Sequence, residues 1–183
     1  MGHELTDEDL LARARNPDTA GYAFNLLVRR YQERLYRVIR RMVIDDETAQ
    51  DLLQETFVKA WRNLDKFRAD AKLSTWLYRI ATNEALSHLR KQKRRFFQPI
   101  EDVEGQLARQ VDQTLGPDAD HIEQKLQHAI LRLPERQRMV FQLRYYDEMP
   151  YEDMAELFSI SVGALKASYH HAVKKIEAYV TAH

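Results

Sequence analysis

One amphipathic stretch near the N-terminus constrains the fold of this chain most. From about Thr19 to Met42, apolar side chains recur at spacings of three and four residues: Phe24, Leu27, Val28, Tyr31, Leu35, Val38, Ile39 and Met42. That spacing is typical of a long α-helix with one buried face. Gly and Pro number only five each among 183 residues, and residues that favour helices dominate the rest. The sequence therefore predicts an all-α protein.

Further helices and their ends follow from caps and breakers. Thr6 is a predicted N-cap for a helix ending near Arg15, and Asp45 or Asp46 is the predicted cap of a helix reaching Leu64. Residues 65–72 interrupt the pattern, which resumes from Ser74 or Thr75 to about residue 95. Four more helices are expected near 122–131, 135–146, 152–158 and 162–180, with Pro134 and Pro150 at helix starts.

Residues 98–120 separate two groups of helices. They contain two prolines and two glycines and show little periodicity, which favours a linker over a loop inside one domain. We therefore predict two helical domains, residues 1–97 and 122–183, joined by a flexible linker over 98–121. The C-terminal domain is predicted to be a helix-turn-helix domain, for the reasons given below.

Charge is distributed unevenly although the formal net charge is zero. Residues 21–97 carry 17 basic and nine acidic side chains, whereas residues 98–123 carry one basic and seven acidic. A basic block followed by an acidic connector suggests a domain that binds a polyanion, although uneven solvated helix faces would look the same. There is no cysteine and no apolar run long enough to span a bilayer, and the first residues are acidic and lack the apolar stretch expected of a signal peptide. We expect a cytoplasmic protein without membrane insertion.

The strongest local motif spans residues 151–176. A short helix, the turn Ser159-Ile160-Ser161 and a longer helix form a predicted helix-turn-helix, with small Ala155 at the helix crossing and Ser161 as cap. The predicted buried stripe of the second helix is Leu165, Tyr169, Ala172 and Ile176. The opposite face carries small, Lys and His residues suited to a DNA major groove. An ordinary helical hairpin with a solvated face is the alternative.

A second group of residues, 65–95, combines aromatic, cationic and amide side chains. The loop supplies Phe67, Arg68, Asp70 and Lys72, and the following helix supplies Arg79, Asn83 and the cluster Arg90, Lys91, Lys93 and Arg94. Such a combination suits single-stranded DNA, because rings stack on bases, amides read base edges and cations hold phosphates. Trp76, Leu77 and Ile80 are better interpreted as core residues.

A third group lies in residues 49–64. Ala49, Leu53, Phe57, Ala60 and Leu64 make the predicted inward stripe of this helix. Asp51, Leu52, Gln54, Glu55 and Val58 are then expected to face elsewhere. An exposed mixture of apolar, acidic and amide groups suits a partner protein, and equally an ordinary surface.

Four segments in this order resemble the extracytoplasmic-function (ECF) sigma factors of bacterial RNA polymerase. They are Asp-Leu-Leu-Gln-Glu-Thr-Phe-Val-Lys-Ala-Trp (51–61), Phe-Arg-Ala-Asp with Ser-Thr-Trp-Leu-Tyr-Arg-Ile-Ala-Thr-Asn (67–83), Leu-Pro-Glu-Arg-Gln-Arg-Met-Val-Phe (133–141) and the helix-turn-helix. The resemblance covers about residues 6–96 and 122–180. Together the four segments make it highly specific.

The resemblance implies a sigma factor that directs transcription initiation, with core RNA polymerase and promoter DNA as partners. The helix of Asp51, Leu52, Gln54, Glu55 and Val58 would dock on the clamp helices of the largest subunit. The residues from Phe67 to Arg95 would recognise and melt the minus-ten element. The flap of the second-largest subunit and an anti-sigma factor are further expected partners, and the acidic linker would thread the RNA-exit path.

The resemblance assigns the minus-thirty-five element to the second helix of the helix-turn-helix. The residues concerned are Ser161, Lys166, Ala167, Ser168, His170, His171 and Lys174. Many members of the family have Arg where Ser168 and His171 stand, so the bases that are read here are not set by the resemblance.

Two rival functions follow from the same patterns. A stand-alone helix-turn-helix regulator would bind duplex promoter DNA without polymerase and would not need residues 51–58. A helical catalytic or scaffold protein would show no polymerase binding. The sequence offers no catalytic triad, phosphate loop or metal-ligand spacing, so we expect no enzyme activity, no cofactor and no metal.

Overall fold

The computed structural model describes residues 5–68, 71–96, 105, 108–109, 111–112 and 121–182. Regular elements in these residues are helical throughout, as predicted. The N-terminal half contains α1 (Asp7–Ala14), α2 (Ala20–Val43), α3 (Asp46–Asn63), the 3-10 turn η1 (Leu64–Lys66) and α4 (Leu73–Phe96). The C-terminal half contains α6 (His121–Leu131), α7 (Glu135–Tyr145), α8 (Tyr151–Phe158) and α9 (Val162–Ala182). Most of the predicted linker lies outside the described residues, so its limits stay predictions.

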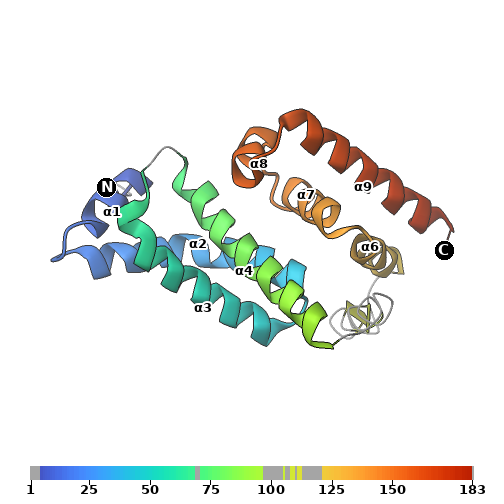
Figure 1. Cartoon of the computed structure of the whole chain (residues 1–183), viewed down its shortest axis with the longest axis horizontal. Helices are drawn as coiled ribbons and strands as arrows, with labels where there is room; N and C mark the ends of the chain where they lie inside the picture. Colours follow the sequence, from blue (N-terminus) through green and yellow to red (C-terminus); the bar gives the residue numbers. More distant parts are fainter. Residues whose placement is uncertain are drawn as a thin grey trace.

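Helix α2 is the centre of the N-terminal bundle, because α1, α3 and α4 all pack against it (Figure 1). Of its eight predicted core residues, Leu27, Tyr31, Leu35, Val38, Ile39 and Met42 are buried, and Phe24 and Val28 are partly buried against the same core. The predicted cap of α1 is confirmed: the Thr6 hydroxyl accepts from Asp9 N at 3.2 Å, and the Asp9 carboxylate accepts from Thr6 N at 2.9 Å. Asp45 caps α3 by accepting from Thr48 N at 2.8 Å.

Helices α6, α7 and α9 pack together, and α8 joins α9 through a tight turn. Ser159 ends α8 with φ 55° and ψ 44°, a left-handed conformation that turns the chain sharply. Ile160 N donates to Ala155 O, and the Ser161 hydroxyl accepts from Ala164 N at 3.2 Å, so Ser161 caps α9 as predicted. The second helix of the motif therefore leaves the turn in a fixed direction.

The two halves of the chain are packed against each other, with α8 on α4 and α7 on α2 (Figure 1). One hydrophobic cluster runs through both halves and includes Leu35 and Leu77 from the first half, and Leu143, Met154 and Leu157 from the second. The sequence did not predict this contact, because each half has its own helical pattern and the connection between them looks like a linker.

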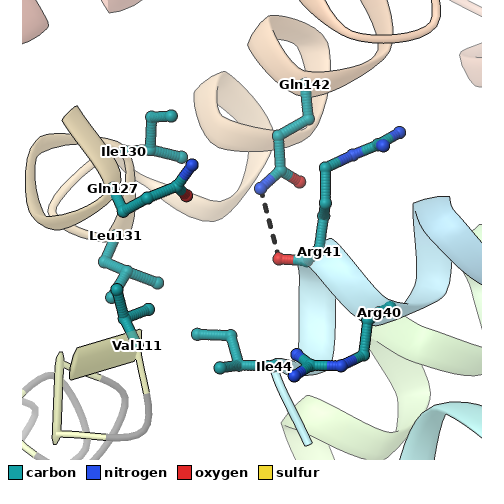
Figure 2. A pocket seen from close by; sticks show the side chains of 8 residues that line it. All are labelled: Arg40, Arg41, Ile44, Val111, Gln127, Ile130, Leu131 and Gln142. Atoms are coloured by element: carbon teal, nitrogen blue, oxygen red, sulfur yellow. Dashed lines mark hydrogen bonds between the residues drawn. The ribbon is translucent and has the colours of Figure 1, made fainter. Parts of the chain in front are cut away.

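A cleft of about 300 Å³ lies beside this contact, where the end of α2 approaches α6 and α7 (Figure 2). Its apolar lining is Ile44, Val111, Ile130 and Leu131, and its polar lining is Arg40, Arg41, Gln127 and Gln142. Figure 2 shows the hydrogen bond that closes one side of the cleft, in which Gln142 Nε2 donates to Arg41 O at 3.2 Å.

Candidate nucleic-acid and partner-protein surfaces

Helix α9 has a buried side and an exposed side. The predicted inward residues Leu165, Ala172 and Ile176 are buried, and Tyr169 is partly buried. The predicted DNA-facing residues lie outside the core: Ser161, Lys166, Ala167, His170, His171 and Lys174 are exposed, and Ser168 is half-buried. A helix with small residues, lysines and histidines on its open side fits the shape and charge of a major groove.

Stacked rings hold α9 on α7. The Tyr169 ring lies parallel to the Phe141 ring at a centroid distance of 5.7 Å, and Phe141 stacks on Tyr145 at 5.2 Å. Burial raises the pKa of the Tyr169 hydroxyl above its ordinary value, which already keeps the ring neutral at physiological pH. These ring contacts join α9 to α7.

The loop between α3 and α4 differs from expectation at its aromatic residue. Phe67 was predicted to offer its ring to DNA, but only 5% of it is exposed. Its ring packs on Trp76 with centroids 5.1 Å apart, and its carbonyl accepts from Arg15 Nη2 at 2.7 Å. Phe67 is therefore a core residue in this structure. Arg68 is exposed, and Asp70 lies outside the described residues.

Helix α4 presents a polar face formed by Arg79, Asn83, Arg90 and Arg94. At 3.6 residues per turn these four positions fall within an arc of about 60°. Asn83, Arg90 and Arg94 are exposed, as is Lys91, whereas Arg79 is half-buried. The side chain of Lys93 lies outside the described part of the structure. Trp76 and Ile80 pack on the core and Leu77 is buried, as predicted.

Two cations of this group already have partners in the C-terminal half. Lys72 Nζ lies 2.9 and 3.0 Å from the two carboxylate oxygens of Asp153, and Arg79 Nη2 donates to Glu156 O at 2.6 Å. The Asp153 carboxylate raises the pKa of the Lys72 ammonium group above its ordinary value, through a hydrogen bond and its charge. Both acceptors belong to α8.

Helix α3 presents the predicted partner-protein surface with one correction. Asp51, Gln54, Glu55 and Val58 are exposed, but the expectation for Leu52 is wrong, because only 9% of it is exposed. Helix α3 packs against both α2 and α4, so it buries a wider arc than one stripe. Thr56 of the same helix is buried as well. The Thr56 hydroxyl donates to Leu52 O at 2.7 Å, which satisfies it inside the core.

Sequence reasoning missed Trp61 as part of the same surface. Trp61 is 45% exposed and Val58, three residues earlier, is 40% exposed. The Trp61 ring packs edge-on against Phe24 at 4.9 Å, so it is held in place while part of it faces solvent. An exposed Trp beside an exposed Val is the kind of surface that partner proteins cover. The sequence did contain a signal for this exposure, because Trp61 lies outside the predicted inward stripe of its helix.

Among the described residues, no group of three or more His, Asp or Glu side chains is arranged to hold a metal ion. In the same part of the chain, no helix is both long and apolar enough to cross a membrane.

Comparison with protein families places these surfaces in two known regions. The family model for Sigma-70 region 2 matches residues 27–95, and that for Sigma-70 region 4 matches residues 123–176. The ECF RNA polymerase sigma-E factor of Escherichia coli K12 is 35% identical over 187 residues, covering 97% of this chain and 95% of that protein. The chain belongs to the ECF sigma factors. This sigma factor therefore acts in transcription initiation, directing core RNA polymerase to promoters, and its family consists of initiation factors that are not enzymes.

Further relatives agree with this assignment. The RNA polymerase sigma-H factor of Pseudomonas aeruginosa is 36% identical over 181 residues, which are 93% of this sigma factor and 92% of the relative. The solved structure of CnrH in complex with the cytosolic domain of CnrY has a TM-score of 0.70 at 27% identity, covering 96% and 97% of the two chains. RpoE of Bartonella quintana, solved in complex with the anti-sigma factor NepR, shares the fold with a TM-score of 0.66 at 22% identity, covering 86% and 96%.

Proposed function

We propose that this sigma factor divides its work among three helices: α3 docks on polymerase, α4 recognises and melts the minus-ten element, and α9 reads the minus-thirty-five element. The observation that carries the proposal is the single polar face of α4, where exposed Asn83 lies in line with exposed Arg90 and Arg94. An amide among cations offers base recognition and phosphate binding side by side. Binding energy alone does this work, without covalent chemistry.

Melting requires that the surface prefer unpaired bases. Extruding a base costs a few kcal/mol, which contacts to the extruded base must offset. Asn83 can donate to and accept from a base edge, and the cations at the end of α4 can hold the displaced strand. Phe67 is buried in this structure, so we do not expect its ring to stack on a base. We propose that Asn83 and Arg68, together with Lys72 and Arg79, hold the extruded base.

Duplex recognition upstream rests on α9. Ala167 and Ser168 are small enough for close approach to the groove floor, while Lys166, His170 and Lys174 reach outward. Sequence is read by contacts to base edges, and the lysines add attraction to phosphates that does not depend on sequence.

Docking on polymerase is assigned to Asp51, Gln54, Glu55 and Val58, with Trp61 added from the structure. We propose the clamp helices of the largest subunit as the partner of α3 and the flap of the second-largest subunit as a partner of the C-terminal domain. The acidic linker then follows the RNA-exit path, where its negative charge resembles that of RNA. Because polymerase acts in the cytoplasm, we place the protein there.

An anti-sigma factor is proposed as a further partner. CnrH is seen with the cytosolic domain of CnrY, and RpoE of Bartonella quintana with NepR, which supports a regulator of this class for the present chain. The rival function, a stand-alone helix-turn-helix regulator, would leave the exposed face of α3 and the polar face of α4 without a role.

Asn83→Ala tests the melting surface, with Asn25→Ala as matched control because Asn25 is also an exposed helical asparagine. With core polymerase and a responsive promoter, Asn83→Ala should lower open-complex formation about tenfold, the size of one lost base contact. Polymerase binding should stay unchanged. Permanganate reactivity of non-template thymines is the measurement, and a pre-melted promoter should restore part of the loss.

The outcome that contradicts the assignment is wild-type thymine reactivity in Asn83→Ala. An equal loss in Asn25→Ala would show instead that the effect is not specific to α4.

A further inference from the structure

Tyr151, the first residue of α8, contacts side chains of both α7 and α9. Its ring meets the Tyr169 ring of α9 edge-on, with centroids 6.4 Å apart and ring planes at 79°. Tyr169 in turn stacks on Phe141 of α7. Two cations lie over the Tyr151 ring: Arg144 Cζ, from α7, is 5.0 Å from the centroid, and Lys166 Nζ, from α9, is 5.7 Å from it. One half-buried ring therefore joins three helices of the C-terminal half.

The Tyr151 ring is restrained on two sides. Arg144, which lies over it, is itself held by the main chain, because its Nη1 donates to Met149 O at 3.1 Å in the turn between α7 and α8. Tyr169 supports the same ring from α9, and Tyr169 is fixed by its stacking on α7. A ring that is held in this way is a platform against which a more flexible side chain can be ordered.

Lys166 is the flexible side chain that this platform orders. It is exposed, on the side of α9 that faces away from the core. Fixing the long stem of a lysine on a ligand costs conformational entropy. The attraction of an ammonium group to a ring face restricts the stem before the ligand arrives. A ring also adds no negative charge beside the ammonium group, whereas Lys72 is paired with the carboxylate of Asp153. Lys166 is therefore ordered without a neighbour that would repel DNA.

We propose that Tyr151 is a positioning residue for duplex recognition, which holds Lys166 in the direction in which Lys166 contacts the minus-thirty-five element. The inference rests on the proposed function, which assigns Lys166 to that element. It extends that function by placing a determinant of recognition outside α9, in the first helix of the helix-turn-helix (Figure 1). Tyr151 acts through Lys166, and its own hydroxyl has no part in the effect.

Two substitutions separate the ring from the hydroxyl. Tyr151→Phe keeps the ring and removes the hydroxyl, whereas Tyr151→Met removes the ring and fills much of its space with a flexible apolar side chain. Each full-length variant is combined with core polymerase, and its affinity for a labelled promoter that depends on the upstream element is measured at one salt concentration. Tyr151→Met should bind about threefold more weakly than wild type, the effect of one exposed contact between a cation and a ring. Tyr151→Phe should match wild type.

A double-mutant cycle shows whether the effect passes through Lys166. Lys166→Ala should weaken binding about tenfold. Adding Tyr151→Met to Lys166→Ala should cause no further loss, because no ammonium group is left to position. Lys174→Ala is the matched control, since Lys174 is also an exposed lysine of α9 but lies about 12 Å farther along the helix. The losses from Lys174→Ala and Tyr151→Met should multiply.

Nuclear magnetic resonance of the free full-length chain tests the contact without changing Tyr151. A proton over the face of an aromatic ring is shifted upfield, so the ε-methylene protons of Lys166 should resonate upfield of those of Lys174. The variants Lys166→Ala and Lys174→Ala assign the two signals. Equal chemical shifts for the two lysines overturn the inference, even if Tyr151→Met does not fold.

The binding outcomes separate the positioning role from the proposed function. Losses from Tyr151→Met and Lys166→Ala that multiply overturn the positioning role, and so does a Tyr151→Phe variant that is as weak as Tyr151→Met. Tighter binding by Tyr151→Met also overturns it, because the ring would then withhold Lys166 from DNA. In these three cases the reading of the upstream element by α9 stands. If Lys166→Ala and Lys174→Ala both bind as wild type, that reading fails and the positioning role fails with it.

Discussion

The burial of Leu52 separates stability from polymerase docking on α3. Leu52 is 9% exposed and belongs to the core of the N-terminal half, whereas Glu55, three residues later, is exposed. Truncating a buried leucine to alanine removes its burial and leaves a cavity, at a cost of about 2–5 kcal/mol. Taking about 3 kcal/mol for a residue at the edge of the core, Leu52→Ala should lower Tm by about 6–12 °C in a chain of this size. Glu55→Lys should leave Tm almost unchanged.

Binding to core polymerase should show the opposite pattern. Per folded molecule, Leu52→Ala should bind as well as wild type, whereas Glu55→Lys should lose about tenfold or more in affinity because it reverses a charge at the interface. Thermal unfolding followed by circular dichroism measures the first effect, and fluorescence anisotropy with labelled protein below its Tm measures the second. An unchanged Tm together with weakened polymerase binding in Leu52→Ala would refute the burial argument and return Leu52 to the docking surface.

Three further perturbations follow from the same structure. Alanine at Lys166, His170 and His171 together should abolish dependence on the upstream promoter element without changing helicity; an unchanged upstream footprint would exclude this face of α9. Thr6→Ala should lower the free energy of unfolding by about 1 kcal/mol because it removes the cap of α1, and a small fall in Tm should show this. An unchanged Tm would mean that the capping box does not contribute to stability. Hydrogen bonds from Thr48 hold the pKa of the Asp45 carboxyl below its ordinary value of 3.8. The contribution of this carboxylate to the free energy of unfolding is therefore complete above pH 3.8, and it is lost as the pH falls through the lower pKa of the folded state. Asp45→Asn should therefore be less stable than wild type at neutral pH and equal to it in acid, as followed by denaturant unfolding; a difference that persists in acid would contradict this.

Local structure could be predicted from the sequence because local rules decide it. The cap at Thr6, the cap at Ser161 and the buried stripe of α9 depend on residues within a few positions of each other, and the structure has them as expected. The exposed sides of α4 and α9 follow from the same periodicity. Helical periodicity therefore made the candidate DNA surfaces on α4 and α9 predictable from the sequence.

Long-range packing explains the residues whose burial differs from the expectation. Leu52 is buried because α3 lies between two helices, and a single stripe assumes one neighbour. Phe67 is buried because its ring packs on Trp76, and its carbonyl accepts a hydrogen bond from Arg15, which is 52 residues away in the sequence. The docking of α8 on α4 is also invisible to local patterns, since Lys72 and Asp153 are 81 residues apart.

Run-off transcription with purified core polymerase, with and without this chain, tests the central claim most directly. Linear fragments of bacterial promoter regions serve as templates, and no other sigma factor is present. We expect transcripts that appear only when the chain is added, that start at fixed positions, and that share one pair of upstream elements. The result that contradicts the account is a chain that binds duplex promoter DNA by itself and yields no chain-dependent transcript from any template.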